Sequence, residues 1–256
     1  MRIDLYLVST SRAKSRAHAK EMIDGGFVLL NGKTVKKSSV DVLESDVIEV
    51  NAPPPKYVSR GGLKLDAALS SFGVDPSGKI CCDIGSSTGG FTDCLLQHGA
   101  SKVYAVDSGT GQLDPSLRED GRVVSIEQFN ARDLSVGTLG EFCDIVTADV
   151  SFISQTYIIG RAADVLKDGG IYIGLIKPQF ECGREGLGKK GIVKDEKVRL
   201  EAVRKVIQYA RNEGLRVDSV IESPIRGGDG NTEYLFCGVK VPKSTDISVK
   251  GGADLG

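Results

Sequence analysis

A run of three prolines at residues 53–55 constrains this 256-residue chain more than any other feature. Proline fixes φ and has no backbone N–H, so neither a helix nor a strand crosses such a run, which favours an extended segment. We therefore predict two folded parts. Their boundaries are a small domain over residues 1–50, a proline-rich linker over 51–60, a larger domain over 61–241 and a polar tail over 242–256.

The larger domain shows short apolar segments that alternate with helical patterns. The whole chain contains 40% apolar and 26% charged residues, a composition typical of globular proteins. Such alternation is typical of an α/β fold with a parallel, doubly wound sheet. The last two strands, 215–222 and 233–241, are joined by a loop too short for a helical crossover, which predicts an antiparallel pair. The other predicted strands are residues 80–84, 102–106, 122–126, 144–148 and 171–176.

Residues 1–50 combine helices, a hairpin and a basic face. Ser15 is a good N-cap for a helix that ends near Gly25, and Asn31-Gly32 is a strong signal for a two-residue hairpin turn. This order of elements resembles the small α+β S4 RNA-binding fold. The resemblance implies that the basic residues near the first two helices bind RNA phosphates, although a charged helix face is usually only solvated. These residues are Arg2, Arg12, Lys14, Arg16 and Lys20.

A glycine-rich loop, residues 83–91, follows the first predicted strand of the larger domain. Open α/β sheets bind ligands at this place, the carboxyl end of a strand. The loop fits neither the P-loop pattern nor the dinucleotide fingerprint, which leaves the loop of S-adenosylmethionine-dependent methyltransferases. An acid that ends the second strand can accept both ribose hydroxyls of this cofactor. The predicted cofactor-binding residues are Asp83, Gly85, Ser86, Ser87, Thr88, Gly89, Gly90, Phe91, Asp107, Asn130 and Asp149.

The residues after the fourth and fifth strands narrow the choice of chemical group that accepts the methyl. Residues 149–152 lack the two prolines of the motif found in enzymes that methylate exocyclic amines. No cysteine follows a proline, as the nucleophile of pyrimidine carbon-5 methylation usually does, so an oxygen acceptor is the leading hypothesis. Pro178 forces Lys177 into an extended conformation, so its side chain can reach the crevice at the carboxyl end of the sheet. The six cysteines and two histidines show no zinc-ligand spacing, and we predict no metal site.

Short motifs along the whole chain resemble those of one family, the TlyA-type hemolysin and ribosomal RNA 2′-O-methyltransferases. They read VSRGGLKL at 58–65, DIGSSTGGFT at 83–92, GQL at 111–113, DVSFIS at 149–154, KPQFE at 177–181 and GNTEY at 230–234. The resemblance implies a Rossmann-like class I S-adenosylmethionine-dependent methyltransferase domain of the FtsJ kind behind the S4 domain. It also implies a Lys-Asp-Lys-Glu catalytic tetrad, which falls on Lys64, Asp149, Lys177 and Glu233. The linker departs from the family pattern Arg-x-Trp-Val, because Tyr57 stands where the family has tryptophan.

The family implies an enzyme that methylates the ribose 2′-hydroxyl of cytidines in ribosomal RNA. Its cofactor would be S-adenosyl-L-methionine, and its partners would be ribosomal RNA or ribosomal subunits. A ribose hydroxyl is a poor nucleophile near neutral pH, so transfer benefits from a group that accepts its proton. We predict that Lys177 receives or steers this proton and that Asp149 and Glu233 orient both lysines. Lys64 would stabilise the developing oxyanion.

Three other functions fit parts of the pattern. A cytolysin, which the hemolysin name suggests, needs a membrane-inserting segment, and no apolar run approaches the roughly 18 residues of a membrane span. A non-catalytic RNA-binding or ribosome-assembly factor has no need of the glycine loop and the tetrad. A pseudouridine synthase can carry an S4 domain but has no use for a methyl-donor loop. The N-terminus lacks the layout of a signal peptide, so we expect a cytoplasmic protein with no membrane segment and infer no obligate protein partner.

Overall fold

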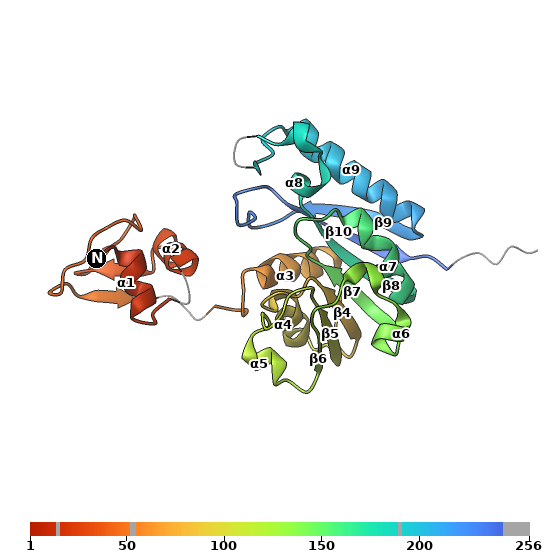
Figure 1. The fold of residues 1–256 in the computed structure, drawn as a ribbon, viewed down its shortest axis with the longest axis horizontal. Helices are drawn as coiled ribbons and strands as arrows, with labels where there is room; N and C mark the ends of the chain where they lie inside the picture. Colours follow the sequence, from red (N-terminus) through yellow and green to blue (C-terminus); the bar gives the residue numbers. More distant parts are fainter. Residues whose placement is uncertain (14–15, 52–54, 189–190, 243–256) are drawn as a thin grey trace, which may run out of the picture. The chain divides into compact units, whose positions relative to one another are not determined.

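The structure is a computed structural model that describes residues 1–13, 16–51, 55–188 and 191–242. The chain divides into two compact units, Met1–Pro55 and Lys56–Gly256 (Figure 1). Among the predicted features, Lys14, the N-cap Ser15, residues 52–54 and the tail beyond 242 lie outside the described residues. Within the described ranges, no helix is long and apolar enough to cross a membrane.

The first unit packs two helices against a small antiparallel sheet of order β2-β1-β3. Its elements are α1 (Ile3–Ser9), α2 (Arg16–Asp24), β1 (Val28–Leu30), β2 (Lys33–Thr34) and β3 (Ile48–Val50). Asn31 and Gly32 have φ values of 51° and 74°, as the central residues of a type I′ turn require, which confirms the predicted hairpin. The unit has a core of its own, which includes Ile3, Leu7, Ile23, Val28 and Ile48.

The second unit is built on a seven-stranded sheet of order β6-β5-β4-β7-β8-β10-β9. Strands β4 to β8 are parallel, and β10 lies antiparallel to both β8 and β9. The order grows outward from β4 in both directions, so this is the predicted doubly wound sheet with the predicted antiparallel pair at one end. The strands are β4 (Ile80–Ile84), β5 (Lys102–Val106), β6 (Val123–Ile126), β7 (Cys143–Ala148), β8 (Leu166–Ile176), β9 (Leu215–Glu222) and β10 (Tyr234–Lys240).

One strand is longer than the sequence predicts. β8 begins at Leu166 instead of residue 171, because Leu166 pairs with Cys143 before the ladder resumes with Ile145 and Ile171. The residues between them form an irregularity inside the strand, and Gly169 has a φ of 77° there. A turn-forming sequence is thus accommodated within a strand.

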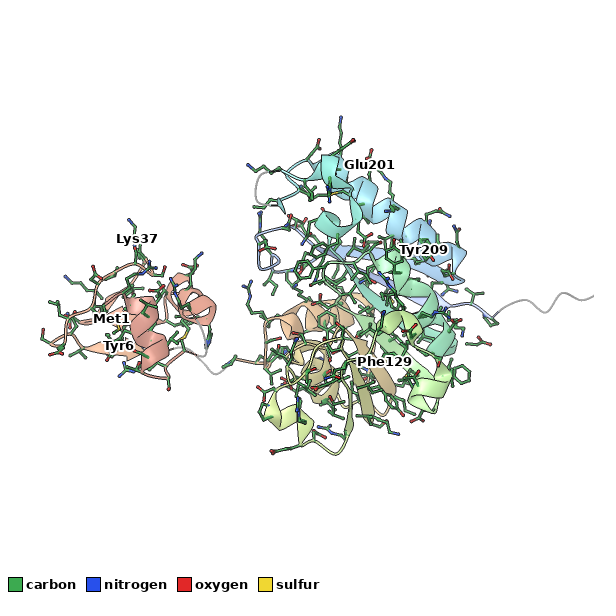
Figure 2. All side chains as sticks on the ribbon, viewed as in Figure 1. Met1, Tyr6, Lys37, Phe129, Glu201 and Tyr209 are labelled. Carbon is green, nitrogen blue, oxygen red and sulfur yellow. The ribbon has the colours of Figure 1, made fainter. Side chains whose placement is uncertain are left out.

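Helices cover both faces of the sheet, and each face has its own core. Helices α3 (Gly61–Phe72), α4 (Gly90–Gln97) and α5 (Pro115–Arg118) pack on one face, while α7 (Ile159–Val165) and α9 (Glu196–Asn212) pack on the other. Successive strand residues alternate between the cores, as Cys81 and Cys82 do. All six cysteines are free thiols. Figure 2 draws the side chains of both units and labels Tyr209 on α9. The shorter elements are α6 (Val136–Leu139), α8 (Pro178–Glu181) and the 3-10 turns Ala131–Asp133, Gln155–Tyr157 and Arg184–Gly186.

The carboxyl ends of the parallel strands form one edge of this sheet. Because β10 is antiparallel, its first residue lies at the same edge. The strand order reverses direction between β4 and β7, which is where open α/β sheets bind ligands. The predicted residues Gly85, Asp107, Asp149, Lys177 and Glu233 lie at or beside this edge, because each directly adjoins one of these strand ends.

Candidate active site

The glycine loop after β4 is pressed against the loop after β7. Gly85 has a φ of 79°, and a Cβ placed on it would lie 2.6 Å from the backbone oxygen of Asp149. The backbone N–H of Asp149 in turn donates to the carbonyl of Ile84 at 3.0 Å. No side chain fits between the two loops, so this position requires glycine for packing alone.

Asp107 joins the glycine loop to the end of β5. Its Oδ2 accepts a hydrogen bond from the backbone N–H of Ser87 at 2.8 Å, and its Oδ1 accepts one from the N–H of Gly109 at 2.7 Å. Ser87 adopts a left-handed conformation, with φ 47°, that turns its N–H toward this carboxylate. Each carboxylate oxygen keeps a second lone pair, so Asp107 can still accept hydrogen bonds from two hydroxyl groups of a ligand.

Asn130 follows β6 and lies near Asp107. The backbone N–H of Phe129 donates to the carbonyl of Asp107 at 3.0 Å, which places the segment after β6 beside the end of β5. Asn130 itself is exposed and caps a 3-10 turn, where its Oδ1 accepts from the N–H of Arg132 at 3.1 Å. Its side chain is therefore open to solvent near Asp107.

Asp83 is fully buried at the end of β4. Its oxygens accept hydrogen bonds from the hydroxyls of Thr92 at 2.7 Å and Thr147 at 3.1 Å. Burial raises the pKa of Asp83 to about 7, while both threonine hydroxyls act to lower it. Asp83 is thus a carboxyl group that changes its charge near neutral pH.

The other loop residues differ in how far a ligand can reach them. Ser87 and Thr88 are exposed, whereas Ser86, Gly89 and Gly90 are buried. Phe91, which the sequence placed among the cofactor-binding residues, has its ring in the core between sheet and helices and is 3% exposed. Its ring therefore packs the loop from behind, and only backbone atoms of this residue can face a ligand.

The first tetrad pair joins α3 to the start of β10. The Nζ of Lys64 lies 2.5 Å from Oε2 of Glu233, and the residues are 8% and 2% exposed. Lys64 lies on the buried side of α3, one turn after the helix begins, and Glu233 directly precedes the first paired residue of β10. Two opposite charges are therefore held together out of water.

The second tetrad pair joins the ends of β7 and β8. The Nζ of Lys177 lies 2.6 Å from Oδ1 of Asp149 and donates a hydrogen bond to the Oγ of Ser151 at 2.8 Å. Lys177 is 9% exposed, and the Asp149 side chain is 20% exposed. The contact with Asp149 is an ion pair whose angles are not those of a hydrogen bond, because this Oδ1 accepts none from the described residues. The pair forms the partly open side of the tetrad.

Strand register brings the two pairs to one place. The antiparallel ladder of β8 and β10 ends with Ile176 opposite Tyr234, so Lys177 and Glu233 are the next residues on the two strands. Asp149 follows β7, the neighbour of β8 on its other side. The four residues thus come from three adjacent strand ends and one helix, and their formal charges sum to zero.

Two residues beside the tetrad were quoted in the sequence motifs but not assigned a role. Ser151 accepts a hydrogen bond from Lys177. Its position two residues after Asp149 is the sequence feature that could have indicated this role. Phe152 is 90% exposed and has a φ of 65°, and its ring centroid lies 5.3 Å from that of Phe180. An exposed aromatic ring on a strained backbone is unusual, and the sequence alone gives no sign of the strain.

The basic residues of the first unit are engaged within the unit. Arg2 and Arg16 both form ion pairs with Oδ2 of Asp4, at 2.9 Å and 3.1 Å, and Asp4 is 2% exposed. Arg12 donates to the carbonyl of Ile48 at 2.6 Å. Lys20 is exposed on α2. Arg2 and Arg16 thus meet at one buried carboxylate, and RNA binding by the basic residues stays a prediction.

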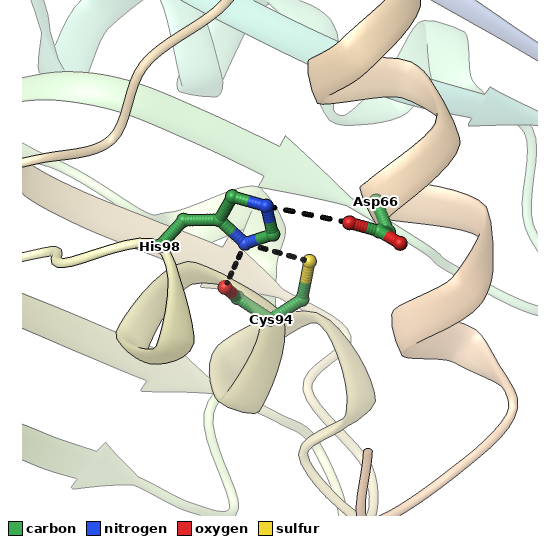
Figure 3. A group of neighbouring side chains, drawn as sticks. All are labelled: Asp66, Cys94 and His98. Carbon is green, nitrogen blue, oxygen red and sulfur yellow. Dashed lines mark hydrogen bonds and ion pairs between the residues drawn. The ribbon is translucent and has the colours of Figure 1, made fainter. Parts of the chain in front are cut away.

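One group of potential metal ligands lies between α3 and α4 (Figure 3). Single ligand atoms of Asp66, Cys94 and His98 lie within 4.8 Å of one another. His98 Nδ1 lies 2.9 Å from the carbonyl of Cys94, and Nε2 lies 3.3 Å from Oδ1 of Asp66. The other oxygen of Asp66 is paired with the ammonium of Lys56 at 2.7 Å. Because a cation already occupies the carboxylate, we interpret the group as a polar link that fastens residue 56 and α4 to α3.

Tyr57 is packed into the second unit. It is 3% exposed, and a Cβ on Gly62 would lie 2.3 Å from its ring. The N–H of the next residue, Val58, donates to Oδ2 of Asp93 on α4 at 2.8 Å. The residue that departs from the family pattern thus belongs to the core beneath the glycine loop.

Comparison with known proteins identifies the two units. The FtsJ-like methyltransferase family matches residues 57–240, and the S4 domain matches residues 1–48. The chain is 44% identical to Hemolysin A of Brachyspira hyodysenteriae, over 92% of this chain and 98% of that protein. It is 38% identical to the 16S/23S rRNA (cytidine-2′-O)-methyltransferase TlyA of Mycobacterium tuberculosis, over 99% of this chain and 94% of that protein. The solved structure of a protein with a hemolysin name from Streptococcus thermophilus has a TM-score of 0.76 and 39% identity, over 95% of this chain and 89% of that one.

The fold and these matches define a class I methyltransferase of the FtsJ-like kind that carries an S4 domain. The chain belongs to the TlyA-type family, as its motifs predicted. The predicted Rossmann-like fold with a small N-terminal S4 domain is confirmed.

Proposed function

We propose that this protein transfers the methyl group of S-adenosyl-L-methionine to the ribose 2′-hydroxyl of cytidines in ribosomal RNA, with the S4 unit binding the RNA. The observation that carries this proposal is the pairing of all four tetrad residues in two ion pairs, one buried and one partly open, at the carboxyl end of the sheet. The relative from Mycobacterium tuberculosis is named for cytidine 2′-O-methylation of 16S and 23S rRNA, which supports the choice of nucleotide and of RNA.

The residues at the carboxyl edge fit S-adenosyl-L-methionine. When bound, this cofactor supplies an electrophilic methyl group. Asp107 keeps free lone pairs for two ribose hydroxyls, and Asn130 offers an exposed amide for the adenine. Asp83 becomes a carboxylate near pH 7, which suits a nearby ammonium group. Ser87 and Thr88 are exposed and complete the predicted cofactor-binding loop.

The tetrad would activate the hydroxyl. Lys177 would receive or steer the hydroxyl proton, and its ion pair with Asp149 would orient it. Ser151, which accepts a hydrogen bond from Nζ, would fix the direction of this group. Lys64, oriented by Glu233, is the cation that stabilises the oxygen as it develops negative charge. Much of the rate would come from holding the hydroxyl in line with the methyl group.

The RNA partner is proposed on the S4 unit and the family. An S4 domain with exposed basic residues supports an RNA substrate, and we propose ribosomal RNA, free or within a ribosomal subunit, in the cytoplasm. Arg12 and Lys20 would contact phosphates, and Arg2 and Arg16 would do so from their shared position over Asp4.

The test is methylation of defined RNA by the purified full chain. Ribosomal RNA and both subunits from cells without a TlyA-type enzyme are incubated with S-adenosyl-L-methionine, and 2′-O-methyl groups are mapped by nucleotide. We expect new 2′-O-methyl cytidines that Lys177→Ala abolishes. Lys167→Ala is the matched control, because it removes a lysine paired with Asp144 at 2.7 Å at the opposite end of the same two strands. Methyl groups on bases, or none at all, would overturn the proposal.

A further inference from the structure

Two loops carry the Asp149–Lys177 ion pair, and the tetrad does not by itself fix their spacing. One loop runs from Asp149 to the turn Gln155–Tyr157 after β7, and the other is Lys177 with α8 after β8. The last residues that the two strands pair are Ala148 and Gly174, so ladder hydrogen bonds stop before either loop begins. Other contacts must hold the two loops at the distance that gives a 2.6 Å ion pair.

Gln155 lies where β7 and β8 part. Its Nε2 donates to the carbonyl of Ala148 at 3.2 Å and to that of Leu175 at 2.9 Å, and its Oε1 accepts from the hydroxyl of Tyr172 at 2.6 Å. The residue is 1% exposed. The two carbonyls belong to the residue just before Asp149 and to the residue two before Lys177. The buried amide of Gln155 therefore links the ends of β7 and β8 at a point where the two strands no longer share ladder hydrogen bonds.

Glu181 joins the far ends of the same two loops. Its Oε2 accepts from the hydroxyl of Ser154 at 2.5 Å, and its Oε1 accepts from the backbone N–H of Gln155 at 2.7 Å. Glu181 is 6% exposed and closes α8, the helix that starts directly after Lys177. The loops are thus tied at one end by the ion pair and at the other by a buried carboxylate.

We propose that Gln155, Tyr172 and Glu181 are positioning residues for methyl transfer, which set Lys177 against Asp149 without touching the reacting atoms. This inference rests on the proposed function. Placement matters because a displacement of about 1 Å in a reacting geometry can lower a rate about a hundredfold. A purely structural role predicts something else: lower stability, with an unchanged rate for each folded molecule.

The opposite end of β7 offers a matched set of controls. There Glu141 accepts hydrogen bonds from the hydroxyl of Tyr104 and from Lys102, both at 2.8 Å. Tyr104 is 5% exposed and Tyr172 is fully buried, and each hydroxyl donates one hydrogen bond. The acceptor of Tyr104 is more open, because the Glu141 side chain is 35% exposed. The test compares Glu181→Gln with Glu141→Gln, and Tyr172→Phe with Tyr104→Phe, all in the full chain. Tyr172→Phe keeps the ring and its packing, so it serves if Glu181→Gln does not fold.

Three quantities are measured on each folded variant: the single-turnover transfer rate and its pH profile, the affinities for S-adenosyl-L-methionine and RNA, and the melting temperature. We expect Glu181→Gln and Tyr172→Phe to lower the rate about tenfold to a hundredfold and to displace the pH profile, with affinities within about threefold. The two controls should keep the wild-type rate whatever their effect on the melting temperature, because they lie at the opposite end of β7. Rates within about threefold of wild type, with an unmoved pH profile, would overturn the inference.

A second readout does not need activity. The rate at which a small acylating reagent labels Lys177, measured by mass spectrometry, reports the surroundings of its Nζ, and Lys64 in the same digest is the internal reference. The positioning variants should change the Lys177 rate relative to Lys64, and the controls should not. If the wild type methylates no ribosomal RNA, the proposed function fails, while this labelling still decides the inference: an unchanged ratio refutes it.

Discussion

The Lys64–Glu233 pair allows stability to be separated from chemistry. Both side chains are nearly excluded from water, at 10% and 3% exposed, and their charged atoms lie 2.5 Å apart. Glu233→Leu leaves a buried ammonium without a partner, and Lys64→Met leaves a buried carboxylate, so each should cost about 3–5 kcal/mol of unfolding free energy. The double variant places two apolar side chains of similar size in the same space. It should recover most of that loss, because replacing a buried ion pair by apolar residues is often neutral.

The assay must report on the second unit alone, because the chain has two compact units and a whole-chain signal mixes their unfolding. Native-state hydrogen exchange of the β10 amides gives the free energy of unfolding at this place. Methyl transfer is measured on the same samples and should be lost in both single variants and in the stable double variant. A cost below about 1 kcal/mol for Glu233→Leu would show that water still reaches the pair. Methyl transfer by the double variant would refute the role given to Lys64.

Further perturbations test the other parts of the site. Lys177→Ala should abolish methyl transfer and leave the affinities for cofactor and RNA nearly unchanged. Lys177→Arg should also be inactive, because a guanidinium cannot accept a proton. A single-turnover transfer rate within about threefold of wild type for the arginine variant would contradict the base role. Burial raises the pKa of Asp83 to about 7, above that of the unfolded chain, so the folded state holds the proton more tightly and loses stability as pH rises from about 4 through 7. Asp83→Asn should remove this loss in melts recorded between pH 5 and pH 8, and equal pH slopes for the two proteins would contradict the assignment. Lys20→Gln should reduce the slope of log K for RNA against log salt by about one, and no change would mean that Lys20 contacts no phosphate. Deleting residues 1–50 should leave a folded unit that binds S-adenosyl-L-methionine in calorimetry but does not methylate ribosomal RNA, and full methylation would refute the division of labour.

The fold could be predicted because its signals are local. Each strand of the second unit is a short apolar segment bounded by turn residues, and the glycine loop marks the end of the first of them. The short loop after residue 222 was enough to predict the antiparallel pairing of β9 and β10. The start of β8 was misjudged because residues 168–170 have the sequence of a turn, and only pairing with Cys143 shows that the strand begins before them.

The pairing within the site could not be predicted in the same way. Lys64 and Glu233 are separated by 169 residues, and which lysine meets which acid depends on the register of β8 with β10 and on the packing of α3. The network around Gln155 was missed for a related reason. A glutamine in a helical pattern has no distinctive spacing, and its role arises only where two strands diverge.

The carboxylate of Asp4 forms ion pairs with the guanidinium groups of Arg2 and Arg16. A nucleic-acid phosphate is also an anion and would bind the same two groups. A guanidinium group has five N–H donors, so each arginine that holds Asp4 keeps others for a second anion. Because Asp4 already restrains both side chains, their conformational entropy is largely lost before any RNA arrives. Binding of a phosphate at this surface should therefore have a small entropic cost and need little rearrangement.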